Sequence, residues 1–429
     1  MKWLQGDFTT IKELLEIERT KDDPQTKKTA DAVAAIIQAV RYEGDDALRA
    51  YTNSFDNQDI LDFRVSSEVI TEALNSCDPE LLKSLTTAKQ NIESFHKQQL
   101  ANGFVDTEKA GVVRGQLYRP IETVGIYVPG GTAAYPSSVL MNAIPAKIAG
   151  VSRIVMVTPP SEAGIPSTIL AAAALAGVDE VYKIGGAQAI AALAYGTESI
   201  PKVDKIIGPG NRFVAAAKRA VFGEVGIDMI AGPSEIVVAA DETANPAFIA
   251  ADLLSQAEHD PEAAAILITT SQTIAEQTEK AVTDQLQTLA RRAIAEQALQ
   301  DHGKIIVAAS TADLFEIVNL LAPEHLEIQL ESPFSYLHAV KHAGSIFLGN
   351  YASEPLGDYV AGPNHVLPTS GTARFSSPLS VYDFQKRMSF VSYTKEALEA
   401  EKDAIIRIAE SEGLQAHARA IQIRYKEEF

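Results

Sequence analysis

Val124-Gly125-Ile126-Tyr127-Val128-Pro129-Gly130-Gly131-Thr132 is an apolar strand segment followed by a glycine-rich turn, and a helical pattern begins at Ser137. The same order of strand, glycine turn and helix recurs at 180–188 and 205–211. This repetition predicts parallel βαβ units, because two neighbouring parallel strands need a crossover helix between them. Ligands bind such sheets where the strands end, and the helix N-termini there offer free N–H groups to phosphate.

Further strand segments follow at 234–239, 263–269, 304–307 and 344–349, with helical patterns between most of them. A chain of 429 residues is too long for one ordinary core, so two or more domains are expected. The glycine- and proline-rich stretch 350–378 is too long for an idle connection, which is typical of active-site segments.

The composition excludes several classes of protein. A net charge of −19 disfavours a nucleic-acid partner, which would require a basic face. No apolar run reaches membrane-spanning length and the N-terminus lacks an apolar signal core, so a cytoplasmic location without membrane contact is expected. Cys77 is the single cysteine, so a metal site would have to use nitrogen and oxygen ligands.

Ligand-type side chains occur at the end of the helical run 248–259. Gln256 and His259 are three residues apart, so both leave one face of the last turn and could hold a metal if other ligands join them. The alternative is a surface histidine that complements the helix dipole. Asp358, in the long loop, is either an oxygen ligand or a turn former.

Other histidines leave alternatives open. Glu324-His325 places an acid beside a base after Pro323, which suits proton transfer, although a capping glutamate with a surface histidine fits as well. His338 and His342 are four apart on an expected helix, which is metal-ligand spacing without the glutamate that a zinc protease needs. Glu412 and His417, near the C-terminus, would by themselves be solvated surface.

Eight segments in order, spread over nearly the whole chain, together resemble the histidinol dehydrogenases. They are Val124–Gly131, Ile184–Ile190, Ile207–Asn211, Ala231–Glu235, Leu254–His259, Leu321–Glu327, Gly362–Thr369 and Glu412–His417.

The resemblance implies a zinc- and NAD-dependent enzyme that oxidises L-histidinol to L-histidine through L-histidinaldehyde, in the last steps of histidine biosynthesis. The implied metal ligands are Gln256, His259, Asp358 and His417. The implied dinucleotide contacts are Tyr127, Gln188 and Asn211. The implied substrate contacts are Ser234, His325, Glu412 and the four metal ligands. Glu324 and His325 match the acid/base pair.

The expected fold class is α/β, with two Rossmann-like parallel-sheet domains, one inserted in the other, and helical N- and C-terminal segments. The expected division is an arm at 1–25, a first domain with the metal and catalytic residues at 26–126 and 233–376, a second domain on the dinucleotide side at 127–232, and a C-terminal helical segment at 377–429. The implied assembly is a homodimer whose C-terminal segment completes the partner's site.

Three rival interpretations remain. The first is a related zinc/NAD dehydrogenase that acts on another alcohol, such as a sulfonated diol, rather than on an amino alcohol. The second is a zinc hydrolase built on His338 and His342, and the third is a zinc-binding protein without catalysis. Glu412 and the Glu324-His325 pair argue against the first, because they suit a substrate that carries an amine and an imidazole.

Overall fold

The computed structural model describes residues 1–19, 24–130 and 134–425, so Gly131 and Thr132 of the first glycine turn lie outside the described residues. The chain divides into two compact units. Unit 1 comprises Met1–Gln99 and Ile121–Phe384, and unit 2 comprises Leu100–Pro120 and Gln385–Phe429.

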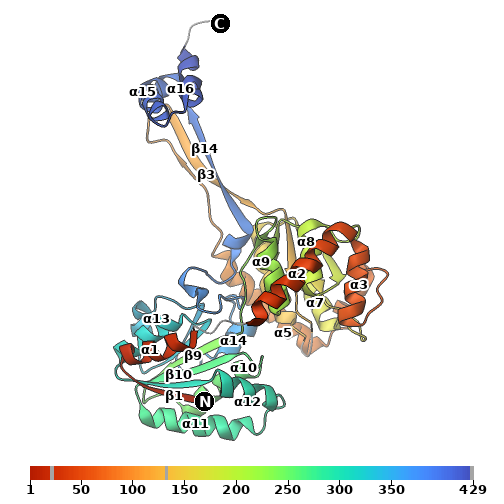
Figure 1. Cartoon of the computed structure of the whole chain (residues 1–429), viewed down its shortest axis with the longest axis vertical. Helices are drawn as coiled ribbons and strands as arrows, with labels where there is room; N and C mark the ends of the chain where they lie inside the picture. The colour runs from red at the N-terminus through yellow and green to blue at the C-terminus, as the bar shows by residue number, and fades with distance from the viewer. Residues whose placement is uncertain (20–23, 131–133, 426–429) are drawn as a thin grey trace. The chain divides into compact units, whose positions relative to one another are not determined.

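Unit 1 contains a six-stranded sheet in which all neighbouring strands are parallel (Figure 1). Its order is β1 (Lys2–Gly6), β11 (Lys304–Ala308), β10 (Ala264–Thr269), β9 (Glu235–Ala240), β12 (His325–Gln329) and β13 (Ser345–Leu348). One face packs against α10 (Pro246–Ala257), α11 (Gln272–Leu286) and α12 (Arg292–Asp301). The other face packs against α1 (Phe8–Arg19) and α13 (Thr311–Leu321).

Unit 1 also contains a five-stranded parallel sheet. Its order is β6 (Glu180–Lys183), β5 (Arg153–Thr158), β4 (Thr123–Tyr127), β7 (Lys205–Ile207) and β8 (Gly226–Ile227). Its two faces pack against α6 (Pro136–Ala149) and α7 (Ser167–Ala176), and against α8 (Gly186–Tyr195) and α9 (Arg212–Val221). Ile154 and Met156 face one core while Val155 and Val157 face the other, which is why this strand is apolar without alternation.

Both sheets have the doubly wound strand order, which confirms the predicted α/β class with two parallel sheets. Taken in chain order and leaving β1 aside, the strands of each sheet are arranged 3-2-1-4-5. The five-stranded sheet with its helices lies between α1 and β9 in the chain, so one sheet is inserted in the other.

Two assignments within the predicted division differ from the packing. The expected N-terminal arm at 1–25 contains β1, which pairs with β11 and buries Leu4, so its first residues are part of a sheet. The segment 26–126 was expected with the first domain, yet its helices pack around the five-stranded sheet. These helices are α2 (Pro24–Glu43), α3 (Asp45–Asp56), α4 (Ser67–Asn75) and α5 (Pro79–Lys97). Their buried faces join its two cores through residues such as Val33 and Ile92, and the division otherwise stays a prediction.

Unit 2 is an antiparallel three-stranded sheet with two α-helices. Its strand order is β14 (Gln385–Tyr393), β3 (Val112–Pro120) and β2 (Phe104–Asp106), and the helices are α15 (Lys395–Ser411) and α16 (Gln415–Gln422), followed by the short η4 (Ile423–Tyr425). The expected C-terminal helical segment at 377–429 therefore contains a strand, β14, ahead of its two α-helices. No helix of the described residues is long and apolar enough to cross a membrane.

The remaining helical pieces of unit 1 are short. They are η1 (Pro333–Ala339), α14 (Glu354–Tyr359), η2 (Thr372–Arg374) and η3 (Val381–Phe384). The predicted long loop 350–378 thus contains α14, the element that carries Asp358.

Candidate active site

The catalytic and metal-ligand residues predicted in unit 1 gather at the edge of the six-stranded sheet where its strands begin. His325 is the first residue of β12 and pairs with Ile236, next to Glu235, the first residue of β9. The helix α10 follows β9 and runs antiparallel to the strands, from the edge where they end to the edge where they begin. His259, just after its C-terminus, therefore lies at the edge where His325 lies. This is the opposite edge from the one where doubly wound sheets ordinarily bind ligands.

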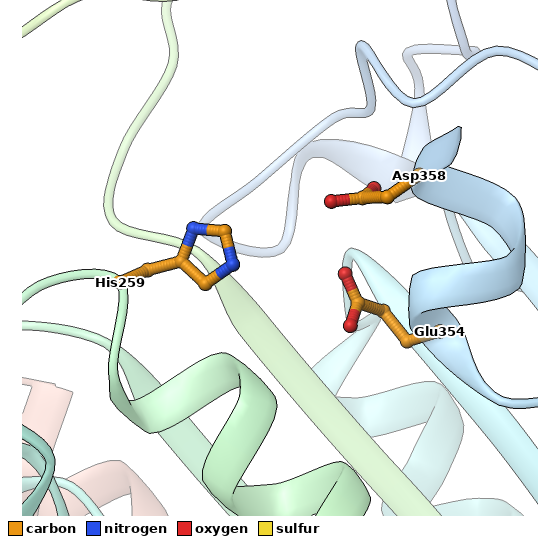
Figure 2. Close-up of side chains that lie close together, drawn as sticks. All are labelled: His259, Glu354 and Asp358. Atoms are coloured by element: carbon orange, nitrogen blue, oxygen red, sulfur yellow. The ribbon is translucent and has the colours of Figure 1, made fainter. Parts of the chain in front are cut away.

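Three side chains at this edge form a cluster with metal-ligand geometry. One ligand atom from each of His259, Glu354 and Asp358 lies within 4.8 Å of the other two. Figure 2 shows the imidazole of His259 facing both carboxylates. His259 is exposed, Asp358 is half-buried and Glu354 is buried.

The two carboxylates of the cluster come from one turn of α14. Positions four apart lie on the same face of a helix, which places Glu354 beside Asp358. Burial, and next the charge of Asp358, raises the pKa of Glu354 to about 8. Two acids held this close favour a cation between them.

Glu354 was not among the residues predicted from the sequence. It lies in the loop predicted to be functional, four residues before Asp358. Pro355 stands in the first turn of α14, where proline is well tolerated. A search of that loop for carboxylates at helical spacing could have found Glu354.

Gln256 suits a metal site because its side chain is buried and its carbonyl oxygen has no hydrogen-bond partner among the described residues. It lies in the last turn of α10 and is 1% exposed, and its Oε1 atom is buried without a hydrogen-bond partner among the described residues. A buried, unpaired carbonyl oxygen costs free energy unless a donor or a cation satisfies it. An amide oxygen, an imidazole and carboxylates form a donor set that suits Zn²⁺, although the amide is an uncommon ligand.

The other predicted contacts are distributed between the two units. Ser234, half-buried, immediately precedes β9 and so stands at the same sheet edge as Glu235. Glu412 caps the C-terminus of α15 and His417 lies in α16, both in unit 2. The approach of Glu412 and His417 to the cluster therefore stays a prediction.

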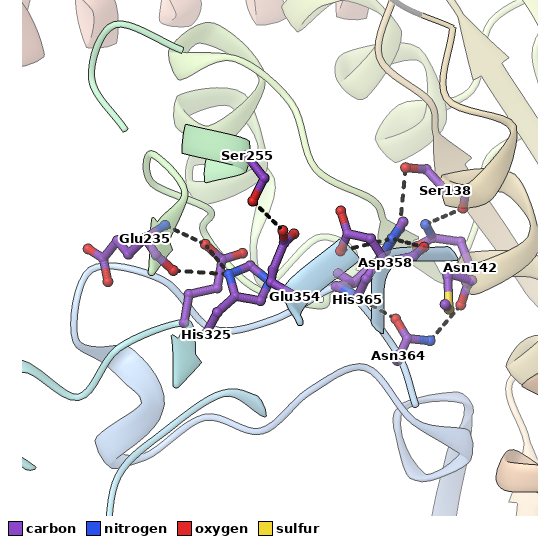
Figure 3. A network of polar contacts seen from close by, with 12 residues as sticks. Ser138, Asn142, Glu235, Ser255, His325, Glu354, Asp358, Asn364 and His365 are labelled. Atoms are coloured by element: carbon purple, nitrogen blue, oxygen red, sulfur yellow. Dashed lines mark hydrogen bonds and ion pairs between the residues drawn. The ribbon is translucent and has the colours of Figure 1, made fainter. Parts of the chain in front are cut away.

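The backbone of Glu235 binds both members of the predicted acid/base pair. Its N–H donates to Oε2 of Glu324 at 2.8 Å, and its carbonyl oxygen lies 3.0 Å from Nδ1 of His325 (Figure 3). A carbonyl can only accept, so Nδ1 of His325 carries the proton and Nε2 carries the lone pair. Nε2 is buried and has no hydrogen-bond partner among the described residues.

Burial sets the protonation of both groups. Burial lowers the pKa of His325 to about 4, so the imidazole is neutral at neutral pH and can accept a proton. Burial also raises the pKa of Glu324 well above its usual value, although the hydrogen bond from Glu235 opposes this shift. Both groups are thus displaced toward their uncharged forms, as is common at catalytic sites.

A cavity of about 260 Å³ adjoins these groups. Its lining includes His325, Phe347, Leu356, Asp358 and His365. Nδ1 of His365 lies 3.0 Å from the backbone oxygen of Asp358 and 3.6 Å from its Oδ1, so this histidine holds the end of α14 (Figure 3). The cavity combines an apolar wall with a base and an acid, which is the usual character of a small-molecule site.

The proposed pairing of His338 with His342 on one helix is wrong. His338 lies in the 3-10 helix η1, which ends at Ala339, and His342 lies beyond it. Val340, at the end of η1, is extended, so the two side chains are not on one face of an α-helix. The basis for a zinc hydrolase is thereby lost.

The residues predicted to contact the dinucleotide lie at the carboxyl edge of the five-stranded sheet, where its strands end. Tyr127 is the last residue of β4, and its hydroxyl accepts a hydrogen bond from the N–H of Gly186 at the start of α8. Gln188 is 1% exposed, with its Oε1 buried and unpaired among the described residues. Asn211 caps the N-terminus of α9 by accepting from two backbone N–H groups.

The turn after β7 is held tightly against β4. Gly208 has φ +106°, and a Cβ there would lie 2.1 Å from the backbone oxygen of Tyr127, so only glycine fits. Lys218 and Asp228 form a buried ion pair beside this turn. Lys218 donates a hydrogen bond to the carbonyl of Gly208, and the N–H of Gly208 donates to the carboxylate of Asp228. These fixed turns and the N-termini of α8 and α9 suit a ligand that carries phosphate.

Comparison with known proteins identifies the family. The histidinol dehydrogenase family model matches residues 19–425. The histidinol dehydrogenase of Listeria innocua is 64% identical over 428 residues, which is 100% of both chains, and that of Streptococcus mutans is 57% identical over 99% of both. The crystal structure of histidinol dehydrogenase from Elizabethkingia anophelis has a TM-score of 0.89 at 44% identity, covering 94% of this chain and 93% of that one.

The chain belongs to the histidinol dehydrogenase family. Membership confirms the resemblance inferred from the eight sequence segments. It also confirms that the protein is an oxidoreductase, and the structural match confirms the α/β fold class.

We predict that His325 stays neutral, as the Nδ1–H tautomer, from pH 7 down to about pH 4. The unfolded chain takes up a proton near the ordinary value of 6.5, whereas the folded chain does so near 4. The contribution of this group to stability is therefore present above pH 6.5 and lost as the pH falls through 4. Histidine-selective ¹⁵N NMR of the metal-free protein, with His325→Asn for assignment, measures this directly. A midpoint near 6.5 would contradict the buried, neutral base.

Proposed function

We propose that the protein oxidises L-histidinol to L-histidine through L-histidinaldehyde, with NAD as hydride acceptor and Zn²⁺ as the bound metal. The observation that carries this proposal is the buried, unpaired Nε2 of His325 at the sheet edge that also holds His259 and Asp358. Membership of the histidinol dehydrogenase family supports the choice of substrate.

His325 would act as the general base on the alcohol. A primary alcohol becomes an aldehyde by losing a hydride from carbon and a proton from oxygen, so a proton acceptor is needed as the hydride leaves. The hydrogen bond from Nδ1 to the carbonyl of Glu235 orients the ring and supports the positive charge that develops on it. Nε2 is thus the atom that takes the proton.

Glu324 would act on water in the second half of the reaction. The aldehyde must gain water before a second hydride can leave, and a carboxylate can remove the proton from that water. Glu324 is fixed by the N–H of Glu235, and its pKa is raised by burial. A carboxylate with a raised pKa is the stronger base once it is ionised.

Gln256, His259, Asp358 and His417 would hold the metal. Zn²⁺ bound by these groups would supply a fixed positive point that orients an imidazole- and amine-bearing substrate. Glu412 would add a negative charge for the amine, and Ser234 would contact the substrate. The unpaired Oε1 of Gln256 and the close approach of His259 to Asp358 support this assignment.

Tyr127, Gln188 and Asn211 would bind the dinucleotide. NAD bound at this edge would supply the acceptor for the hydride in each step. Three features support this assignment: the N-termini of α8 and α9, the turn at Gly208 that only glycine fits, and the Oε1 of Gln188, which has no hydrogen-bond partner among the described residues. The residues themselves hold and orient the cofactor.

A homodimer would complete each site. Glu412 and His417 lie in unit 2, which forms a compact unit of its own. Unit 2 exposes apolar side chains, among them Val391, which is 68% exposed, and Ile408, which is 60% exposed. Exposed apolar side chains are typical of a surface that contacts another subunit. We propose that unit 2 of one subunit supplies Glu412 and His417 to the partner, and that the enzyme acts in the cytoplasm without nucleic-acid or membrane partners.

We expect two molecules of reduced NAD for each histidine formed when L-histidinol and NAD are added to the zinc-loaded protein. The ratio follows from two hydride transfers and is measured by absorbance together with product analysis. Histidine formed without reduced NAD would contradict the proposal. Turnover of a sulfonated diol but not of histidinol would favour the related dehydrogenase instead.

Two variants separate the half-reactions in the same assay. His325→Ala removes the base, so alcohol oxidation should fall by about 10²–10⁴-fold while the metal content stays unchanged. Glu324→Gln should slow the aldehyde step more than the alcohol step. Released aldehyde would then lower the reduced NAD formed per histidinol consumed from two toward one and raise the amount per histidine formed above two. Loss of metal in His325→Ala, or equal damage to both steps in Glu324→Gln, would show that the roles are wrong.

We also predict that two inactive variants complement each other. Random exchange of His325→Ala and His417→Ala subunits gives mixed dimers with one complete site, so activity should recover to about a quarter of the wild-type value. Recovery requires that His417 serve the other subunit. Mixed dimers that form but remain inactive would show that each subunit uses its own His417.

A further inference from the structure

Glu354 is the most deeply buried member of the ligand cluster, and no role has yet been given to it. It is 2% exposed and forms the first residue of α14. One of its oxygen atoms belongs to the group of ligand atoms that all lie within 4.8 Å of one another, together with atoms of His259 and Asp358. It therefore belongs to the same cluster of potential ligand atoms as His259 and Asp358, two of the ligands assigned above.

Two contacts fix Glu354 in this orientation. Ser255 Oγ donates a hydrogen bond to its Oε2 at 3.2 Å (Figure 3). The backbone N–H of Glu354 donates to Oε1 of Glu327 at 2.8 Å. The first contact ties α14 to α10 immediately before Gln256. Glu354 thus links α14, which carries Asp358, to α10, which carries Gln256.

Glu354 is buried, and a ligand atom of Asp358 lies within 4.8 Å of its carboxylate, so both features oppose its ionised form. An ionised carboxylate buried in this way is costly unless a positive charge offsets it. A cation held by His259 and Asp358 would provide that charge within reach of the Glu354 oxygen.

We propose that Glu354 is a further ligand of the bound metal, so that unit 1 alone offers four donors: Gln256, His259, Glu354 and Asp358. This inference rests on the proposed metal site and adds to it a ligand that the sequence resemblance did not include. Unit 1 would then bind the cation before unit 2 of a partner subunit contributes His417. The metal would be part of the subunit rather than a product of dimer assembly.

A positioning role is the alternative. Glu354 could act only through its hydrogen bond with Ser255 and so hold α10 and Gln256 in place. Loss of a residue that orients a ligand typically weakens metal binding by about 10–100-fold, and loss of a ligand should cost at least as much. Ser255→Ala breaks the same hydrogen bond without removing a donor atom, which makes it the matched control.

The test is the affinity of the metal-free, full-length protein for Zn²⁺, measured by competition with a chromophoric chelator. Glu354→Gln keeps the shape of the side chain and can still accept from Ser255, but an amide is a weaker donor. We expect it to bind Zn²⁺ at least about 100-fold more weakly than the wild type, and Ser255→Ala to lose clearly less, within the range of about 10–100-fold or below that is typical of an orienting residue. Glu354→Asp keeps the charge but moves the carboxylate oxygen away from the cluster, so its affinity for Zn²⁺ should fall more than tenfold. This variant replaces Glu354→Gln in the test if the amide variant does not fold.

Each contrary result has a defined meaning. A loss of tenfold or less in Glu354→Gln, or a loss that Ser255→Ala matches, would overturn the ligand role. His259→Asn distinguishes this failure from failure of the metal site itself. If His259→Asn loses Zn²⁺ while Glu354→Gln keeps it, only the role of Glu354 is wrong, whereas retention of Zn²⁺ by both would place the cation elsewhere.

Discussion

The parallel pairing of β12 with β9 is the constraint on which the site depends. His325 lies opposite Ile236, and this register brings the backbone of Glu235 between Glu324 and His325. One peptide segment thereby donates to the acid and accepts from the base. A shift of one residue would turn the side chains of β12 to the opposite face and break the contacts of Glu324 and His325 with Glu235. Because strands on both sides bury this pairing, the register is strongly specified.

Close to this edge the protein buries several acidic side chains. Asp252, Glu327 and Glu354 are buried acids, and burial raises the pKa of each. Hydrogen bonds from Gln329, from Ser255 and from the backbone N–H of Glu354 offset part of the cost. A divalent cation among His259, Glu354 and Asp358 would offset more of it, so metal binding and stability should be coupled. The neutral His325 keeps its lone pair available because burial outweighs the attraction that the carboxylate of Asp358 exerts on a protonated ring.

Much of the fold could be predicted from the sequence, because apolar strands, glycine turns and helices alternate with regular spacing. The edge strand β1 could not: Lys2–Gly6 is short, and its place follows from pairing with β11, three hundred residues away. The packing of α2 to α5 around the five-stranded sheet was also missed, since an amphipathic helix shows which face it buries but not against which sheet. Among the site residues, Gln256, His259 and Glu324-His325 had local signals, whereas the signal for Glu354, a carboxylate four residues before Asp358, has meaning only if that part of the loop is helical. The roles proposed for Glu412 and His417 depend on another subunit, which periodicity within one chain does not reveal.

The account makes one central claim, that side chains from α10 and α14 meet at a single divalent ion at the amino edge of the six-stranded sheet, next to a neutral His325. Anomalous X-ray diffraction at the zinc absorption edge, on crystals of the zinc-loaded protein, tests it most directly. The claim predicts one strong peak per site, about 2.0–2.2 Å from a nitrogen of His259 and an oxygen of Asp358. A peak at other residues, or none at this cluster in crystals that contain stoichiometric zinc, would contradict it.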